Sequence, residues 1–284
     1  MVIVKTIKHA RKIISAAKQK NKTIGFVPTM GALHRGHLSL VKAAKKACDF
    51  VVVSIFVNPT QFSPKEDFRK YPRVFNGDKR MLQKEKVDLI FYPKACEMYT
   101  KNFSTYVEEA CLSKPLCGLT RPGHFRGVCT VVAKLFNIIE PDIAYFGQKD
   151  YQQAQIIKRM VKDLNFPVTI KVFPTIRERD GLAMSSRNAY LNSEERKDAL
   201  VLSESLKLAK KIIKEGESDA KKVINKMRKY ILSKKSAKIS YIEIVDAESL
   251  RAITKIRKKT LIALAVYIGK TRLIDNVILH LKGS

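Results

Sequence analysis

Two histidines at a predicted strand–helix junction are the first candidates for chemistry. His34 and His37 lie in the segment PTMGALHRGHLSLV, residues 28–41, where Gly31 and Gly36 flank them and let backbone approach a ligand closely. A helix N-terminus here would present unpaired N–H groups and a partial positive charge, which suit phosphate. The imidazoles would add hydrogen bonds to a phosphate whose charge is reorganising. The alternative is a helix cap with two surface histidines; a metal site is disfavoured because no third ligand is obvious.

A second group of donors occurs in IRERDGLAMSSRNAYL, residues 176–191. Gly181 permits a turn, and Ser185, Ser186 and Arg187 place two hydroxyls and a guanidinium on a short loop. Such donors suit the outer phosphates of a nucleotide. The alternative is a polar linker between domains.

Lys149 and Asp150, in the segment AYFGQKDYQQ, follow a predicted strand and open a helix. The lysine would reach a phosphate as a point charge, whereas the alternative for the aspartate is that it only caps the helix. Asn58 and Gln61, in FVNPTQF, place amides at the end of an apolar strand, where amides can read a hydroxyl or a carboxylate without adding charge. The alternative there is turn chemistry around Pro59.

The elements that must position these groups alternate along the chain. Apolar spacing predicts helices at 7–20, 37–48, 76–86, 128–139 and 150–164, and strands at 23–30, 50–57, 87–93, 143–147 and 168–174. Such alternation predicts an α/β fold with a Rossmann-like, doubly wound parallel sheet, in which ligands bind beyond the carboxyl ends of the strands. The loops holding PTMG, FVNPTQ and FGQKD are therefore expected to converge on one cleft.

The pattern changes after about residue 176, where a smaller C-terminal α+β domain is expected. Helices are predicted at 193–216, starting at Ser193, and at 219–234, with strands at 239–246 and 260–269. We expect a nucleotide-binding domain at 1–175 and a lid domain at 176–284. Residues 205–238 hold twelve Lys/Arg and three Asp/Glu, a solvated helix face or an anion-attracting lip.

Composition limits the classes of function. The 284 residues include 55 Lys+Arg against 26 Asp+Glu, a net charge of +29 that attracts polyanions. The lysines are scattered and aromatics do not interleave with them as in single-strand binders, so a nucleic-acid partner is not favoured. The five cysteines form no C-x-x-C pair, which disfavours a disulfide framework or zinc site and fits the cytoplasm. The apolar run at the N-terminus is too short for a signal peptide, and no stretch approaches the ~20 apolar residues of a membrane span.

Several common catalytic motifs are absent from the sequence. It contains no G-x-x-x-x-G-K-[ST] phosphate loop, no G-x-G-x-x-G fingerprint and no G-x-S-x-G elbow. A covalent nucleophile therefore has no good candidate. Cys129, two residues after Gly127, is predicted to be a thiol in a helix core.

Five ordered segments together resemble the pantothenate synthetase family of the HIGH-motif nucleotidylyltransferase superfamily. PTMGALHRGH resembles the HIGH-type phosphate motif, and DGLAMSSRN resembles the counterpart of the KMSKS loop. The other segments are FVNPTQF, EDFRKYPR and RPGHFRGVCTVVAKLFNIIEPDIAYFGQKDYQQ. The resemblance is specific over roughly residues 23–191, and the C-terminal third matches in length and pattern more than in motif.

The resemblance implies an ATP-dependent ligase that forms an amide bond. Pantoate, bound with the nucleotide in the domain at 1–175, would attack the α-phosphate of ATP and release pyrophosphate. The amine of β-alanine would then attack the pantoyl-adenylate to give pantothenate and AMP. Mg²⁺ is implied as the counter-ion of the β,γ-phosphates, and a homodimer is expected by resemblance alone.

The resemblance also implies roles for individual residues. His37 matches the residue assigned as proton donor, and His34, Lys149 and Arg187 are the other candidate catalytic residues. The candidate ATP-binding residues are Met30, Gly31, Ala32, Leu33, His34, Arg35, Gly36, His37, Gly147, Gln148, Lys149, Asp150, Ile176, Met184, Ser185, Ser186 and Arg187.

The acid-binding candidates are two glutamines. Gln61 and Gln153 match residues that hold pantoate, and Gln61 also matches one that meets β-alanine. Asp78 is a candidate magnesium neighbour. The chain departs from the family at Gln148, where Glu is frequent, so the charge beside Lys149 differs by one unit. Two alternatives stay open: another nucleotidylyltransferase, for which the two glutamines would have no role, and a basic RNA-binding protein on an α/β scaffold.

Overall fold

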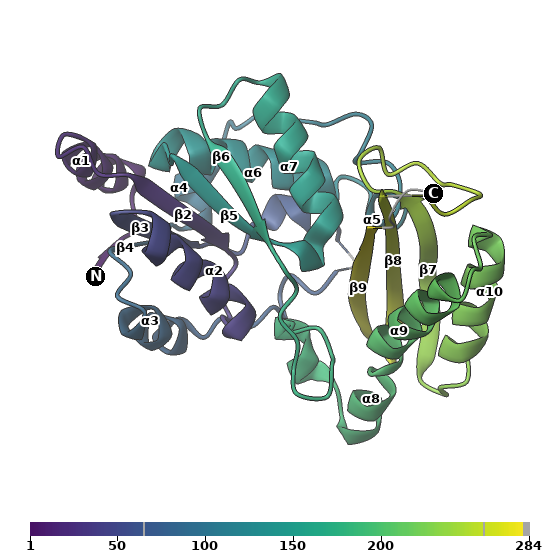
Figure 1. Ribbon diagram of the computed structural model, residues 1–284. Coiled ribbons are helices and arrows are strands. Elements are labelled where there is room, and N and C mark those ends of the chain that lie inside the picture. Colours follow the sequence, from purple (N-terminus) through teal and green to yellow (C-terminus); the bar gives the residue numbers. More distant parts are fainter. Residues whose placement is uncertain (65, 258, 281–284) are drawn as a thin grey trace. The chain divides into compact units, whose positions relative to one another are not determined.

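Two sheets organise the computed structural model, which describes residues 1–64, 66–257 and 259–280 (Figure 1). The chain divides into two compact units. The first unit takes in Met1–Ser113, Arg121–Gln148 and Gln153–Pro174. The second takes in Lys114–Thr120, Lys149–Gln152 and the chain from Thr175 onward. The boundary therefore passes between Gln148 and Lys149, inside one predicted nucleotide-binding segment.

The first unit contains a six-stranded parallel sheet in the order β1-β4-β3-β2-β5-β6. Its strands are β1 (Val2–Val4), β2 (Ile24–Thr29), β3 (Phe50–Ile55), β4 (Leu89–Phe91), β5 (Ile143–Gly147) and β6 (Thr169–Phe173). The central strands are almost wholly buried apolar runs, as expected where helices cover both faces. Thr29 pairs with Ile55 at the shared carboxyl end, so the loops after β2 and β3 start side by side.

Helices cover both faces of this sheet. They are α1 (Ile7–Lys18), α2 (Arg35–Ala47), α3 (Phe75–Lys84), α4 (Ala95–Met98), α6 (His124–Ile139) and α7 (Tyr151–Asp163), with 3₁₀ turns η1 (Pro59–Gln61) and η2 (Gln148–Asp150). Neighbouring residues of a strand point to opposite faces. Val27 packs in one core with Leu40 of α2 and Leu82 of α3, whereas Phe26 contacts Phe136 of α6. Figure 1 shows α2 crossing the first of these faces.

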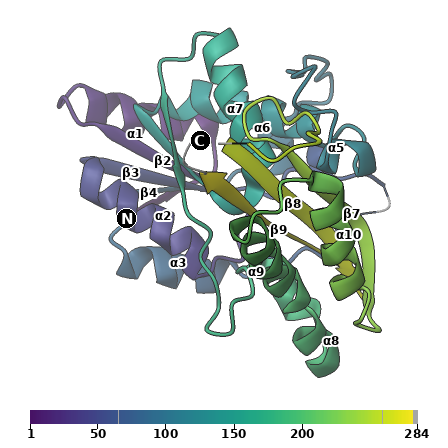
Figure 2. The ribbon, with the colours of Figure 1, turned by 45° about the vertical axis from the view of Figure 1, so that its right-hand side comes forward.

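The second unit contains an antiparallel sheet in the order β7-β8-β9. Its elements are α5 (Cys117–Thr120), η3 (Ser186–Tyr190), α8 (Ser193–Asp198), α9 (Val201–Lys214), α10 (Ala220–Ile231), β7 (Ala237–Asp246), β8 (Lys259–Ile268) and β9 (Thr271–His280). Helices α9 and α10 lie along one face of this sheet (Figure 2). Leu206 of α9, Met227 of α10 and Leu264 of β8 belong to the same buried core.

The predicted fold class is confirmed: a Rossmann-like parallel sheet with a smaller α+β part. The functional division into a nucleotide domain and a lid stays a prediction. The single helix predicted at 193–216 is wrong, because α8 and α9 are separate. The cap also differs, since Asn192, not Ser193, accepts the Glu195 N–H in a capping box. Strands β1 and β9 had not been predicted.

No helix in the described part of the chain is long and apolar enough to cross a bilayer. The five cysteines are all free thiols, three of them buried.

Candidate functional site

A buried carboxylate holds the loop that follows β2. Gly31 has φ +82° and Ala32 has φ +50°, so the backbone after Thr29 turns through the left-handed region. Asp78 of α3 is only 1% exposed, and its two oxygens accept the N–H groups of Ala32 at 2.9 Å and Leu33 at 2.8 Å. Burial raises the pKa of the Asp78 carboxyl, although these two hydrogen bonds act to lower it. The Asp78 carboxylate thus holds the loop after β2 in place.

The two histidines cap helix α2 with their own side chains. His34 is the N-cap residue, and its Nδ1 accepts the Gly36 N–H at 3.1 Å. His37 reciprocates, because its Nδ1 accepts the His34 N–H at 3.3 Å. The rings lie 4.1 Å apart at an interplanar angle of 37°. The capping part of the alternative interpretation is therefore confirmed, although both histidines are half-buried and not surface residues. The expectation of unpaired N–H groups at this helix start is wrong for Gly36.

Capping also fixes which ring nitrogen carries the proton. A nitrogen that accepts an N–H bond has no proton of its own, so each neutral ring must carry it on Nε2. In both rings Nε2–H is therefore a hydrogen-bond donor. A cap and an anion-binding role are consequently compatible in one pair of side chains.

Backbone groups determine the orientation of the Asn58 amide. Its Nδ2 donates to the carbonyl oxygen of Gly127 at 3.1 Å, and its Oδ1 accepts the N–H of Thr60 at 3.4 Å and the hydroxyl of Tyr99 at 2.7 Å. A carbonyl can only accept and an N–H can only donate, so the amide has one possible orientation.

The orientation of Asn58 in turn determines that of Gln61. Asn58 Nδ2 also donates to Gln61 Oε1 at 3.2 Å, which leaves Gln61 Nε2 as the donor end. That end lies 2.9 Å from the sulfur of Met30, a weak acceptor. Gln61 is 8% exposed and presents N–H donors beside the loop after β2. Such an end suits a ligand oxygen, either a hydroxyl or a carboxylate.

The main chain of α6 packs directly against the main chain of η1 at Thr60 and Gln61. A Cβ placed on Gly127 of α6 would overlap the carbonyl of Thr60 and approach Gln61 Cα at 2.7 Å. Only glycine therefore allows α6 to lie this close to η1. The loops after β2 and β3 thus come together in the first unit, whereas convergence of the FGQKD loop with them on one cleft stays a prediction.

In the second unit the loop that carries Ser185, Ser186 and Arg187, here called the serine–arginine loop, is held at both ends. The Met184 N–H donates to the Ile176 carbonyl at 3.0 Å, which brings two predicted nucleotide-binding residues together. Arg177 binds Asp275 of β9 in a bidentate pair at 2.6 and 2.9 Å. Asn188 donates to Glu178 at 2.7 Å, so the segment closes on itself. These contacts order the segment within the second unit, and its interpretation as a polar linker between domains stays an alternative.

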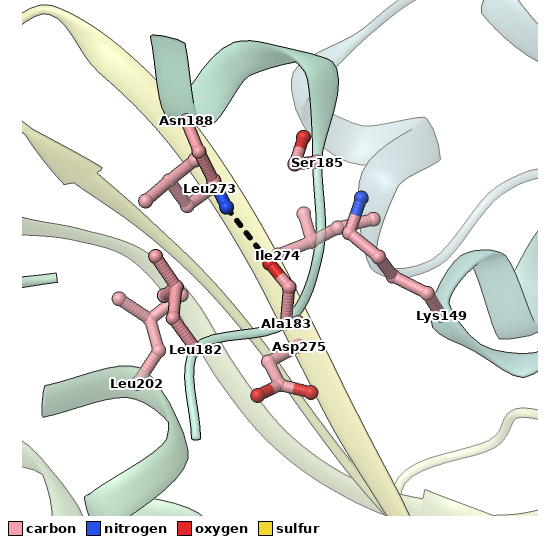
Figure 3. A pocket seen from close by; sticks show the side chains of 9 residues that line it. All are labelled: Lys149, Leu182, Ala183, Ser185, Asn188, Leu202, Leu273, Ile274 and Asp275. Atoms are coloured by element: carbon pink, nitrogen blue, oxygen red, sulfur yellow. Dashed lines mark hydrogen bonds between the residues drawn. The ribbon is translucent and has the colours of Figure 1, made fainter. Parts of the chain in front are cut away.

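A small hollow opens beside this loop within the second unit. Its volume is about 210 Å³ including the mouth, and Lys149, Ser185, Asn188 and Asp275 contribute polar atoms to a lining that is otherwise apolar (Figure 3). The enclosed space within it is only about 10 Å³, roughly what one water molecule needs.

Residues of β9 support Lys149, and no sequence motif indicated them. Asn276 donates from its side chain to the Lys149 carbonyl at 2.8 Å. Its neighbour Asp275, 2% exposed, pairs with Arg177 and also accepts the Asn276 N–H at 2.7 Å. One dipeptide therefore contacts both predicted nucleotide segments of the second unit. The only sequence signal is a pair of polar residues inside an apolar strand.

The other predicted residues are placed as follows. Gly147 ends β5 and Gln148 opens η2 in the first unit, and Asp150 closes η2 in the second. Gln153 lies half-buried in the first turn of α7. Ser185 caps η3 by accepting the Arg187 N–H at 3.3 Å. Met30, Arg35 and Ser186 lie in the loop before α2, at the start of α2 and at the start of η3.

Cys129 lies in the core of α6, as predicted. It is wholly buried, and burial raises the pKa of its thiol to about 12. A thiol so far from ionisation does not serve as a nucleophile at neutral pH.

Comparison with known proteins decides the family. The sequence model described as Pantoate-beta-alanine ligase matches residues 2–278. This chain belongs to the pantoate–β-alanine ligase family. The predicted family and the predicted enzyme class, an ATP-dependent ligase of pantoate and β-alanine, are confirmed.

Individual relatives cover the whole chain. A pantothenate synthetase of Fervidobacterium nodosum is 58% identical over 280 residues, 99% of this chain and 100% of the relative. One of Thermotoga neapolitana is 56% identical over 279 residues, 98% of this chain and 100% of the relative.

Solved structures agree with the sequence relatives. The pantothenate synthetase of Thermus thermophilus superposes with a TM-score of 0.94 at 42% identity, covering 99% of this chain and 100% of that one. The pantoate–β-alanine ligase of Francisella tularensis, solved with beta-gamma ATP and β-alanine, gives 0.81 at 39% identity, covering 98% and 97%.

Proposed function

We propose that this ligase makes its amide bond in two steps, using the residues predicted from the sequence. The pantoate carboxylate attacks the α-phosphorus of ATP and expels pyrophosphate. The free amine of β-alanine then attacks the acyl carbon of the pantoyl-adenylate, AMP leaves, and the amine loses a proton. The orientation of Gln61, with Oε1 held by Asn58 and the N–H donors of Nε2 beside Met30, is the observation that most directly supports an oxygen-rich acid as acceptor.

Binding of the carboxylic acid substrates is assigned to Gln61 and Gln153. Gln61 Nε2 would donate to a hydroxyl or carboxylate oxygen of pantoate in the first step and to the β-alanine carboxylate in the second. Gln153 is assigned to pantoate. Neither side chain adds charge, so the nucleophilic carboxylate keeps its reactivity while it is held in place.

The predicted nucleotide-binding residues are proposed to act on ATP individually. His34 and His37 would donate from Nε2–H to phosphate oxygens, with His37 as proton donor to the departing pyrophosphate. Lys149 would stabilise the α-phosphate, and Ser185, Ser186 and Arg187 the outer phosphates. The segments Met30–His37 and Gly147–Asp150, with Ile176 and Met184, would line the rest. Preorganised donors of this kind stabilise charge that develops in the transition state.

Magnesium is proposed as a partner of ATP. In the described residues no three His, Cys, Asp or Glu side chains gather as metal ligands, and Asp78 directs both oxygens at backbone N–H groups. The role of Asp78 as a magnesium neighbour stays a prediction without support from these contacts. Bound Mg²⁺ would neutralise the β,γ-phosphates.

We also propose a cytoplasmic homodimer, on the family resemblance and on five free thiols, which suit a reducing compartment. Light scattering of the purified chain would measure its mass against the monomer's 32.3 kDa.

The decisive experiment is exchange of labelled pyrophosphate into ATP with pantoate present and β-alanine omitted. Exchange that requires pantoate shows adenylate formation as a separate step. Exchange supported equally by unrelated carboxylic acids would favour another nucleotidylyltransferase. The RNA-binding alternative predicts RNA affinity that falls steeply with salt.

A further inference from the structure

A chain of three side chains leads from the protein surface to the backbone of Gln61. Arg121 donates from Nε to Glu66 at 2.5 Å and from a terminal nitrogen to its other oxygen at 3.2 Å. The other terminal nitrogen of Arg121 lies 2.9 Å from His124 Nε2. His124 Nδ1 lies 2.8 Å from the carbonyl oxygen of Gln61. All these residues belong to the first unit.

These two partners fit one tautomer of His124. A carbonyl oxygen accepts, so Nδ1 donates to Gln61; a guanidinium donates, so Nε2 accepts from Arg121. In this tautomer the ring proton is on Nδ1. This tautomer is the opposite of the one that capping imposes on His34 and His37.

The chain is partly buried and well paired. The side chains of Arg121 and Glu66 are 15% and 21% exposed, and His124 is 9% exposed. Burial raises the pKa of Glu66, but the hydrogen bonds and charge of Arg121, together with the Ser63 N–H, outweigh it and leave the pKa below its ordinary value. Glu66 also accepts the Ser63 N–H at 2.8 Å, which closes the loop after η1. A bidentate pair of this kind fixes direction as well as charge.

Two independent sets of contacts therefore hold Gln61. Asn58 fixes its side-chain amide, and His124 with Arg121 fixes its main-chain carbonyl, to which Arg121 also donates at 3.4 Å. Gly127 removes the remaining freedom by packing against the Thr60–Gln61 main chain. The direction of the Gln61 N–H donors is set from both ends.

We propose that Glu66, Arg121 and His124 form a positioning relay that sets the affinity for the carboxylic acid substrate through Gln61. The relay does not touch the acid; it keeps the Gln61 donors in register with the acid's oxygens. The inference rests on the proposed acid-binding role of Gln61. It predicts that damage to the relay raises KM for pantoate while KM for ATP stays constant.

The principal test compares two substitutions of His124. His124→Leu removes the donor to the Gln61 carbonyl, and at least a tenfold increase in KM for pantoate is expected. His124→Asn can place an amide N–H near the position of Nδ1–H, and it is expected to recover most of that loss. A purely structural role would instead lower Tm in both variants and change the KM values for ATP and pantoate together.

A double-mutant cycle tests whether the three residues act as one unit. Glu66→Gln and Arg121→Gln are each expected to raise KM for pantoate severalfold, and each combined with His124→Leu to add little further. Full additivity of the effects would overturn the relay. Arg73→Gln is the matched control, because the described hydrogen bonds of Arg73 go to nearby backbone carbonyls, at 3.0–3.3 Å. It is expected to lower Tm without changing KM for pantoate.

Gln61→Leu separates this inference from the proposed function. A large increase in its KM for pantoate, with no effect in the His124 variants, would overturn the relay alone. An unchanged KM for pantoate in Gln61→Leu would overturn the acid-binding role of Gln61 and the relay with it.

Discussion

Asn276 donates a hydrogen bond from its side-chain amide to the main-chain oxygen of Lys149 at 2.8 Å. The two residues lie 127 positions apart, and the bond fixes the start of the segment that leads into α7. The position of a candidate phosphate-binding lysine thus depends on the last strand of the chain.

Asn276→Ala is expected to raise KM for ATP roughly tenfold, about 1.4 kcal/mol, because the carbonyl of Lys149 loses its partner and its segment loosens. Steady-state kinetics with each substrate varied in turn checks this. Asn225→Ala, at an exposed position of α10, is the control and should change nothing. Equal increases in the KM values for ATP and pantoate would contradict a local effect on Lys149.

His37→Gln is expected to lower the pantoate-dependent pyrophosphate exchange rate by ~10²–10⁴-fold, because the side chain can still accept the His34 N–H but has no imidazole to transfer a proton. Chemical denaturation should show stability close to the parent. His37→Ala should lose activity equally and about 1 kcal/mol of stability besides, since the cap is gone. Parent-like exchange in either variant would remove His37 from the mechanism.

Asp78→Asn is expected to destabilise the fold by roughly 1–3 kcal/mol, because an amide NH₂ would face a backbone N–H where a carboxylate oxygen now accepts it. Urea unfolding measures this loss. Asp49→Asn makes the same chemical change at an exposed carboxylate that accepts the Thr23 N–H at 3.0 Å, and it should cost less. Similar losses at the two positions would show that burial of Asp78 is unimportant.

A fall to acidic pH should lower the free energy of unfolding more in the parent than in Glu66→Gln. The pKa of Glu66 is lower in the folded chain than its ordinary value, ~4.3 for an unperturbed glutamate. Its stabilisation is therefore complete above that value and is lost as the pH falls through the folded pKa. Unfolding free energies measured at pH 6 and pH 3.5 should differ by less in Glu66→Gln than in the parent. An identical difference would show that Glu66 is not linked to folding in this way.

Gly127→Ala is expected to destabilise the fold by ~1–3 kcal/mol or more, because the added methyl group meets main chain that has no alternative rotamer. Gly77→Ala in α3 is the matched control, since a Cβ there meets nothing within 4 Å. The control should be neutral or stabilising by up to about 1 kcal/mol. Thermal unfolding of both variants, with KM for pantoate, checks the pair.

The sequence predicted the main sheet because buried parallel strands are apolar runs long enough to recognise. Strand β1 was missed because three residues carry too little pattern. Strand β9 was missed because Asp275 and Asn276 interrupt its apolar alternation, and Asp275 is neutralised by Arg177, 98 positions away. No local pattern contains such a pairing.

The same limit applies to the site. The types of the chemical groups could be predicted from motifs: His34, His37, Gln61 and the serine–arginine loop. Their tautomers and amide orientations could not, because these follow from contacts such as that of Asn58 with Gly127, 69 positions apart. The contact of Glu66 with Arg121 joins residues 55 positions apart, so the relay could not be predicted from the sequence for the same reason.

The contact of Gly127 with Thr60 and Gln61 also bears on how the substrate range of this ligase can be altered. The distance between α6 and η1 is set by main-chain atoms, which every amino acid has. Side-chain substitutions therefore cannot widen the space beside Gln61 on this side. Met30 contacts Gln61 from another direction with a flexible thioether. Selection for a bulkier acid should therefore accumulate substitutions at residue 30 and leave residue 127 untouched.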